Sequence, residues 1–293
     1  MNRTADVDAV KPDAENLKIA VLMHLFHIDL MHEMMMYVQS VQKVFPTATV
    51  IITVPLEKNI IELHQQIQKL ISNFHVISVK NIGVDIYAFI VQVQYMRLKG
   101  IRADFILKLH TKKSITPDGA NWRKVLIKPL VSFQNLLHLK QLFIEDKQRT
   151  LNAQFLPSVS QNGVLWRLPT NGTWTSTDWK SSFGFAAVEK HICSIEMDQR
   201  HYPQNLTGIQ KLHDRFGFIH AEYSHFVGGT MFWISGAVID EMLTDELIKY
   251  VTKKFCHGKP PNNNFTDSNC IEYVLERVLS GCFCTQKTNV ILN

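Results

Sequence analysis

The sequence predicts an α/β protein in which a mostly parallel sheet is flanked by helices within a single domain. Two observations support this prediction. Four short apolar runs rich in β-branched residues alternate with three amphipathic stretches over residues 18–109, which is the order that builds a parallel sheet with crossover helices. The composition, 46% hydrophobic and 19% charged over 293 residues, is typical of a chain that buries a core and excludes disorder for most of its length.

The first half of the chain gives the clearest pattern. We predict strands at residues 18–24, 49–54, 75–79 and 104–109, and helices at residues 29–44, 60–74 and 86–98. Pro46 follows the first helix, where a proline is expected to end it.

The second half is less regular. We expect a helix at residues 121–145 that is broken at Pro129, a strand at 227–234, and helices at 240–255 and 267–279. Residues 150–225 show little periodicity, and a Pro/Asn-rich loop is expected at 258–266. Because no repeat or flexible linker interrupts the chain, we expect one domain at residues 18–293, preceded by a disordered tail at 1–17.

Charge and composition exclude several classes of protein. The net charge of +5 is spread along the chain without a Lys/Arg block, which argues against a nucleic-acid partner. The first residues are polar and partly acidic, unlike a secretory signal, and no apolar run has the roughly 18 residues of a membrane span. The five cysteines are then expected to be reduced thiols. These observations predict a cytoplasmic protein, with peripheral membrane attachment through its basic surface left open.

A turn of sequence NIGVD follows the third predicted strand. Asn81 and Gly83 allow a tight turn and a close approach of the backbone to a ligand, because glycine tolerates positive φ. Asp85 opens the next helix, where it would either cap the helix or accept hydrogen bonds from a nucleoside.

A cationic segment, residues 108–114, follows the fourth predicted strand. Alternation places Lys108 and His110 on the same side of this strand, and Lys112 and Lys113 lie in the turn after it. Parallel sheets bind ligands at the carboxyl ends of their strands, so this turn is suited to a phosphate group. The alternative is a solvated basic loop. His24, at the end of the first strand, belongs to the same edge.

Two segments near the end of the chain offer further candidates. Residues 228–233 place paired glycines before an apolar run, so that Thr230 and Trp233 are candidates to line a pocket, with core packing as the alternative. The last predicted helix carries Asp267, Glu272 and Glu276, which form either a cap and a solvated ion-pair face or part of an active site. Cys256, His257, Cys282 and Cys284 fit no standard zinc spacing, and we expect no metal site there.

In this order, the segments resemble the rhamnan synthesis protein F family of glycosyltransferase-like proteins. The matching stretches are residues 19–38, NIGVDIYAF at 81–89, FILKLHTKKS at 105–114, Trp122-Arg123, GTMFW at 229–233 and Leu275-Glu276-Arg277. The resemblance implies a GT-A-like fold, with a nucleotide-sugar-binding half at residues 18–120 and an acceptor-binding half at 121–293.

The resemblance also implies an activity. The expected reaction moves a sugar, such as rhamnose or another deoxyhexose, from a dTDP-, UDP- or GDP-linked donor to a glycan or glycoprotein acceptor with inversion. Similar families follow the fourth strand with an Asp-x-Asp motif that holds a divalent metal. Here His110, Thr111 and Lys112 occupy that place, and the only Asp-x-Asp, formed by Asp6 and Asp8, precedes the first strand. We therefore expect metal-independent or weakly metal-dependent transfer.

The expected roles follow from these considerations. Lys112 and Lys113 would hold the diphosphate in place of a metal, because the leaving group gains negative charge. An inverting transfer needs a carboxylate as general base, and we favour Asp267 over Glu272. The remaining expected donor-binding residues are His24, Asn81, Gly83, Asp85 and His110, and the acceptor-binding residues are Thr230 and Trp233. The alternative is a non-catalytic carbohydrate-binding or scaffold module on a degenerate GT-A fold.

Overall fold

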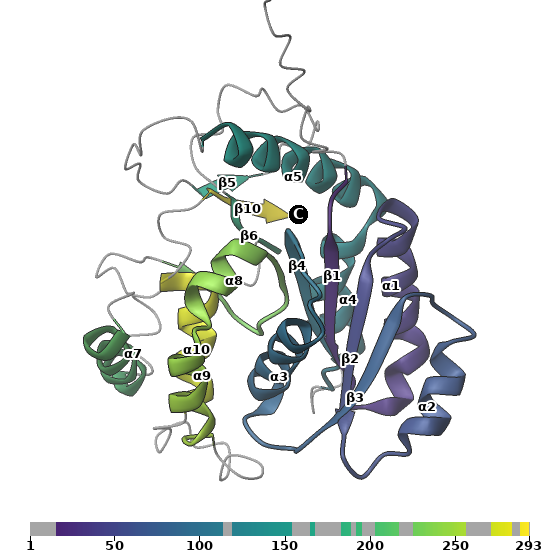
Figure 1. Cartoon of the computed structure of the whole chain (residues 1–293), viewed down its shortest axis with the longest axis horizontal. Helices are drawn as coiled ribbons and strands as arrows, with labels where there is room; N and C mark the ends of the chain where they lie inside the picture. The colour runs from purple at the N-terminus through teal and green to yellow at the C-terminus, as the bar shows by residue number, and fades with distance from the viewer. Residues whose placement is uncertain are drawn as a thin grey trace, which may run out of the picture.

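The computed structural model describes residues 16–113, 119–153, 165–167, 183–188, 192–194, 203–216, 225–255, 271–282 and 288–292. Within them, eight strands form one sheet in the order β3-β2-β1-β4-β9-β6-β10-β5, and β7 and β8 form a second, two-stranded sheet (Figure 1). Only β9 runs antiparallel to its neighbours in the large sheet. The predicted α/β class with a mostly parallel sheet is confirmed.

The first half follows the predicted alternation of strand and helix. Its strands are β1 (Ile19–His24), β2 (Thr49–Pro55), β3 (Phe74–Val79) and β4 (Phe105–His110). Its helices are the short η1 (Ile28–Leu30), α1 (Met31–Val44), α2 (Ile60–Ile67) and α3 (Val84–Leu98). The helix predicted to reach residue 74 is too long. The chain leaves it after α2, and Asn73 takes a positive φ of 49° immediately before β3 begins.

The second half contains more and shorter elements. Its helices are α4 (Gly119–Val131), α5 (Phe133–Ala153), α7 (Pro203–Phe216), α8 (Gly236–Met242), α9 (Asp245–Thr252), α10 (Ile271–Arg277) and the π-helical turn Val278–Cys282. Its strands are β5 (Leu165–Arg167), β6 (Phe183–Val188), β7 (Ile192–Ser194), β8 (His225–Val227), β9 (Phe232–Ser235) and β10 (Thr288–Leu292).

Two predictions for this half are wrong in detail. The single strand expected at 227–234 is two strands in different sheets, because Gly229 and Thr230 take positive φ angles and turn the chain between them. The helix expected at 240–255 is two helices, because Thr244 has an extended backbone and caps α9 by accepting a hydrogen bond from the Leu247 N–H. The break predicted at Pro129 lies instead at residue 132, between α4 and α5.

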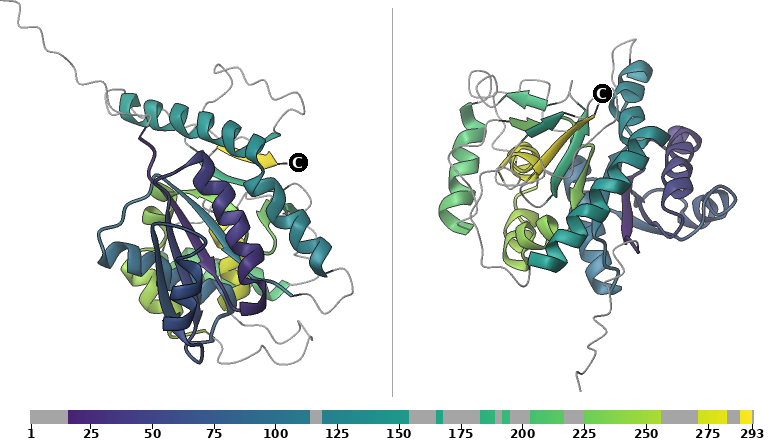
Figure 2. Two further views of the ribbon diagram at one scale, coloured as in Figure 1. Left: turned by 90° about the vertical axis from the view of Figure 1, so that its right-hand side faces the viewer. Right: turned by 90° about the horizontal axis from the view of Figure 1, so that it is seen from above.

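The large sheet has helices on both faces. One face packs against α1, α2, α4 and α5, and the other against α3, α8, α9 and α10 (Figure 2). Side chains alternate between these layers, so that Leu107 of β4 joins the first and Ile106 the second. Lys108 and His110 therefore lie on the α3 side of the sheet.

Several predictions lie outside the described residues. These include residues 1–15 of the tail predicted at 1–17, the loop at 258–266 and Asp267. Leu17 was wrongly assigned to the tail, because it is 6% exposed and packs in the core. The division into a donor half and an acceptor half at residue 120 remains a prediction. No helix within the described ranges is long and apolar enough to cross a lipid bilayer.

Candidate functional site

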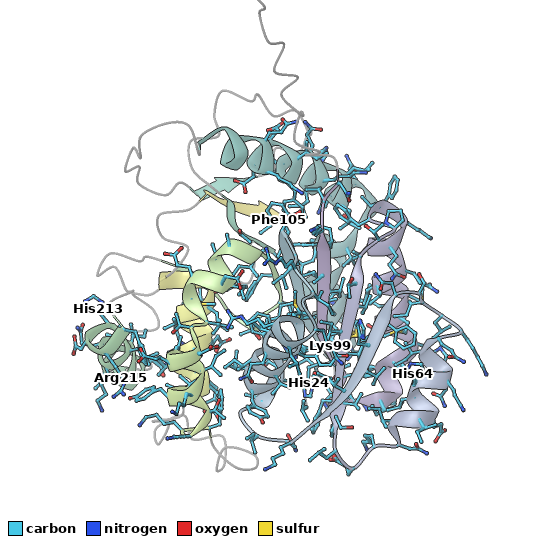
Figure 3. The ribbon with its side chains drawn as sticks, viewed as in Figure 1. His24, His64, Lys99, Phe105, His213 and Arg215 are labelled. Atoms are coloured by element: carbon cyan, nitrogen blue, oxygen red, sulfur yellow. The ribbon has the colours of Figure 1, made fainter. Side chains whose placement is uncertain are left out.

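The candidate site lies at the carboxyl edge, which we define as the edge of the sheet where β1 to β4 end. The residues that end β1 and β4, His24 and His110, are direct neighbours in the parallel pairing of these two strands. Figure 3 places His24 at the lower end of the strands and Phe105, the first residue of β4, near the upper end. Of the predicted donor residues, Gly83 and Asp85 come to this edge at the start of α3.

A buried ammonium group is at the centre of the site. Lys108 is 1% exposed, and its Nζ donates hydrogen bonds to the Asp85 carboxylate and, over 2.9 Å each, to the carbonyl and hydroxyl oxygens of Thr230. The Thr230 hydroxyl in turn donates to the same Asp85 oxygen, Oδ2. We call Lys108, Asp85 and Thr230 the lysine cluster. It ties β4, α3 and the turn before β9 together.

The electrostatics of this cluster keep Asp85 ionised. Burial alone would raise the pKa of Asp85, but His110 and Lys108 nearby and the hydrogen bonds from Lys108 and Thr230 bring that pKa well below its usual value. Burial lowers the pKa of Lys108, and the Asp85 carboxylate opposes this shift. Asp85 therefore acts as an acceptor. Its Oδ2 binds the cluster, while Oδ1 has no hydrogen-bond partner among the described residues.

His110 and Glu276 hold the turn before β9 from two sides. The His110 Nε2–H donates to the Gly229 carbonyl oxygen over 2.8 Å, and burial lowers the pKa of this imidazole. The Gly229 N–H donates to Glu276 Oε1 over 2.7 Å, while Glu276 Oε2 pairs with Arg277 over 2.7 Å. Both oxygens of Glu276 are thus engaged, and this residue links α10 to the lysine cluster.

The backbone beside the cluster is strained. Val84 and Thr230 have φ angles of 46° and 53°, a region that β-branched residues rarely occupy. Each such residue costs on the order of 1–3 kcal/mol and persists only where its surroundings enforce it. Here Val84 immediately precedes Asp85, and Thr230 is held by Lys108 through two hydrogen bonds. Strain of this kind is concentrated at functional sites in proteins.

The turn before α3 is shaped by Gly83. Its φ is 58°, and a Cβ atom at this position would overlap the ring of Phe255. Gly83 is the N-cap of α3, and no side chain caps this helix. Asn81, two residues earlier, is exposed and makes no side-chain hydrogen bond within the described part of the chain.

The turn after β4 is bound to the loop after β1. Thr111 Oγ1 accepts hydrogen bonds from the Phe26 and His27 N–H groups, over 2.9 Å each. Lys113 pairs with Asp29 over 2.5 Å, and both side chains are about half exposed. Lys112 is only partly exposed, and its carbonyl accepts a hydrogen bond from Arg123 over 3.2 Å. The two lysines thus lie beside the site, with the charge of Lys113 already paired.

Trp233 requires a correction. We predicted that it binds the acceptor, but its side chain is 0% exposed and lies on the sheet face opposite the lysine cluster. The indole N–H donates to the Leu130 carbonyl oxygen over 3.0 Å, and the ring packs near Phe143 and Phe45. Side chains along β9 alternate between the two faces of the sheet, and the sequence did not show which face Trp233 would occupy. Thr230 is 3% exposed, with its hydroxyl engaged in the lysine cluster.

Two charged residues of this part of the molecule, Glu272 and Lys108, are buried. Glu272 is 5% exposed near the start of α10, one turn before Glu276. Lys108 and Glu276 were noted in the sequence but were not among the residues expected to bind the donor or the acceptor or to act in catalysis. The signal for Lys108 was a lysine inside an apolar strand, which is rarely buried without a partner.

A separate hollow lies at the amino edge, which we define as the edge where β1 and β4 begin. It encloses about 870 Å³ between the end of α3, the start of β4, α5 and the start of α8. Its charged side chains include both signs, among them Arg97, Arg102, Asp104 and Lys147. In the described residues, no group of three or more His, Cys, Asp or Glu side chains is placed to hold a metal ion.

The fold and the site together define an α/β protein with a polar, strained site at the carboxyl ends of its parallel strands. The profile of the rhamnan synthesis protein F family matches residues 2–157, just over half of the chain. The chain therefore belongs to this family, as its motifs predicted, and membership links it to polysaccharide synthesis. The segment at 229–233 lies beyond the match. A search of curated proteins finds no relative.

Proposed function

We propose that this protein is a glycosyltransferase that moves a sugar, such as rhamnose or another deoxyhexose, from a nucleotide-sugar donor to a glycan, with inversion. The observation that carries the proposal is the lysine cluster at the carboxyl edge, in a chain that belongs to the rhamnan synthesis protein F family. Parallel α/β sheets bind nucleotides at this edge. The cluster keeps the Asp85 carboxylate ionised there, and the Lys108 ammonium balances its negative charge.

The nucleoside is proposed to lie against the start of α3. Asp85 Oδ1 has no partner among the described residues and can accept hydrogen bonds from ribose hydroxyl or base N–H groups. The space beside Gly83 is filled by the Phe255 ring, so Gly83 shapes this turn and does not itself admit the ligand. The exposed Asn81 amide offers both a donor and an acceptor.

The diphosphate is proposed to lie at the turn after β4. A lysine about 4 Å from a phosphate oxygen contributes roughly 4 kcal/mol at an effective dielectric constant near 20. Lys112 and Lys113 could thus stabilise the charge of the leaving group in place of a metal. Lys113 would exchange its half-exposed partner Asp29 for the phosphate, a small loss because exposed ion pairs contribute little.

The acceptor hydroxyl is proposed to lose its proton to Asp267 or Glu272. A carboxylate acting as general base must lie within hydrogen-bond reach of that hydroxyl. Asp267 is four residues before Ile271 in the sequence, and Glu272 lies in the first turn of α10. Loss of transfer in Asp267→Asn with intact donor binding would support the assignment, whereas a near-normal rate would remove it.

A thermal-shift screen tests the donor site. The purified protein is heated with UDP, dTDP, GDP or CMP, each with Mg²⁺, with Mn²⁺ or with EDTA. A ligand at a hundredfold excess over its dissociation constant stabilises the native state by about 2.7 kcal/mol. We expect one nucleotide to raise the melting temperature in EDTA. A shift that needs metal would remove the role of the two lysines but keep the transferase. No shift with any nucleotide would favour the non-catalytic carbohydrate-binding module.

A further inference from the structure

Three buried polar side chains lie beneath the carboxyl edge, one from each of three elements. They are His24 at the end of β1, Thr53 of β2 and Gln92 of α3, and their exposed fractions are 8%, 0% and 1%. We call them the histidine network. Polar groups in an apolar layer are unfavourable unless they are paired, so the geometry of such a network is closely constrained.

Gln92 fixes the network to the backbone of two strands. Its Nε2 donates to the Met23 carbonyl oxygen over 2.8 Å and to the Ile51 carbonyl oxygen over 3.0 Å. The same nitrogen also donates to Thr53 Oγ1 over 3.1 Å, so its two hydrogens are shared among three acceptors.

The single hydroxyl hydrogen of Thr53 then has two possible acceptors. His24 Nδ1 lies 3.0 Å from Thr53 Oγ1, whereas the Met23 carbonyl oxygen lies 3.4 Å away and already accepts from Gln92. Hydroxyl donors prefer distances below about 3.0 Å, so the geometry favours donation to Nδ1. A neutral imidazole whose Nδ1 accepts a hydrogen bond carries its own hydrogen on Nε2.

His24 Nε2 is available to a ligand. It has no hydrogen-bond partner among the described residues, and it is not one of their buried unpartnered atoms, so it reaches solvent. Burial, together with His110 and Lys108, lowers the pKa of His24 to about 4 against the opposing effect of Asp85, which keeps the ring neutral near pH 7. His110 differs, because its Nε2–H is already bound to Gly229.

We propose that Thr53 and Gln92 are positioning residues that hold His24 in the Nε2–H tautomer, and that His24 donates this hydrogen to an oxygen of a nucleoside diphosphate. The identity of the ligand rests on the proposed function, whereas the tautomer does not. In this tautomer Nε2 has no lone pair to remove a proton, so His24 binds the donor and leaves proton removal to a carboxylate.

Nitrogen-15 NMR of the full chain labelled on histidine tests the tautomer directly. Spectra are recorded from pH 5.5 to pH 8, and His24→Gln assigns the resonances of His24. We expect an unprotonated Nδ1 and a protonated Nε2 that stay constant over this range. An Nδ1–H tautomer, or a ring that becomes protonated between pH 6 and pH 7, would overturn the inference without any ligand present.

Thr53→Val keeps the shape of the side chain and removes the hydroxyl group. We expect His24 to become a mixture of tautomers and nucleotide affinity to fall roughly fivefold, as for one lost hydrogen bond. Thr49→Val, at the other end of β2, is the matched control and should change neither. An unchanged tautomer in Thr53→Val would overturn the role of Thr53. If that variant does not fold, the wild-type spectrum still decides.

Titration with UDP, dTDP and GDP separates this inference from the proposed function. A change at His24 Nε2 with the nucleotide that stabilises the protein supports the contact. Stabilisation without a change at Nε2 overturns the contact but keeps the proposed function. If no nucleotide binds, the proposed function fails and the contact to a nucleotide fails with it.

Discussion

The two edges of the sheet hold their charged side chains in opposite ways. At the amino edge, Asp104 accepts hydrogen bonds from the backbone N–H of Lys18 and from the Lys147 ammonium. The side chains of Asp104 and Lys147 remain partly exposed. At the carboxyl edge, the Lys108 side chain is 2% exposed and depends on Asp85 and Thr230 for all its hydrogen bonds. The amino edge has the hollow of about 870 Å³, whose lining includes the buried Asp146. The carboxyl edge differs in having a buried Lys108–Asp85 pair and two β-branched residues, Val84 and Thr230, with positive φ angles.

The comparison shows that the hollow and the buried ion pair lie at different edges of the sheet. Partly exposed ion pairs are screened by water and are easily replaced. A buried charge requires its partners, and a strained backbone requires surroundings that enforce it. Both therefore limit which residues can occupy these positions. For this reason the proposed function is assigned to the carboxyl edge.

The largest expected effect comes from Lys108→Met, which removes the ammonium group and leaves the Asp85 carboxylate buried. Breaking a buried ion pair in this way lowers the free energy of unfolding by about 3–5 kcal/mol. The matched variant at the amino edge, Lys147→Met, should cost about 1 kcal/mol or less. Urea unfolding of both variants measures the difference. Equal losses would remove the distinction between the two edges.

The second effect is on the pH dependence of stability. Burial lowers the pKa of His24 from 6.5 to about 4, so the unfolded chain binds more protons than the native chain between these values. Stability should therefore fall as the pH falls from about 6.5 to 4, and His24 should account for roughly 2 kcal/mol between pH 7.5 and pH 5.

Urea unfolding at pH 7.5 and pH 5 checks this contribution. The loss on acidification should be smaller in His24→Gln than in the wild type, whereas His32→Gln, at an exposed position of α1, should behave like the wild type. The same loss in all three proteins would contradict a buried, neutral His24.

The third effect compares two glycines with similar backbones. Gly83 and Gly100 have φ angles of 58° and 65°, but a Cβ at Gly83 would overlap Phe255, whereas nothing lies within 4 Å of a Cβ at Gly100. Both alanine variants carry the left-handed strain of about 1–2 kcal/mol, and Gly83→Ala adds an overpacking cost of about 1–3 kcal/mol. Thermal unfolding measures both, and the addition of Phe255→Leu should recover part of the difference. Equal losses would contradict the tight packing at Gly83.

The smallest effect on stability concerns the lysines of the turn after β4. Lys113→Gln removes only a half-exposed pair with Asp29, so the free energy of unfolding should stay close to that of the wild type. Its affinity for the nucleotide that stabilises the wild type should nevertheless fall by about fivefold, since the phosphate loses a cation. Isothermal titration calorimetry checks the expected loss of nucleotide affinity. A loss of stability without a loss of affinity would give Lys113 a structural role alone.

The first half of the fold was predictable because β1 to β4 are apolar runs separated by clear helical patterns. The second half was less so. The turn at Gly229 and Thr230 interrupts an apolar run, and no proline marks it in the sequence. Its positive φ angles are enforced by Lys108 and His110, which are distant in sequence, so the local pattern did not reveal it.

The candidate site was predictable as an edge but not as a set of contacts. Strand order alone brings His24, Asp85 and His110 to the carboxyl edge. Nothing in the sequence reveals that Lys108 is the buried partner of Asp85, or that Thr53 and Gln92 hold His24. These contacts depend on which face each side chain occupies and on tertiary packing, and the same uncertainty placed Trp233 on the wrong side of the sheet.

The most direct test of the account compares nucleotide binding in one variant at each edge. Isothermal titration calorimetry is performed in EDTA with the nucleotide that stabilises the wild type, on His24→Gln and on Arg102→Gln, whose residue lines the hollow at the amino edge. We predict that His24→Gln weakens binding by about fivefold while Arg102→Gln binds like the wild type. Weaker binding in Arg102→Gln alone would place the ligand at the amino edge and contradict the account.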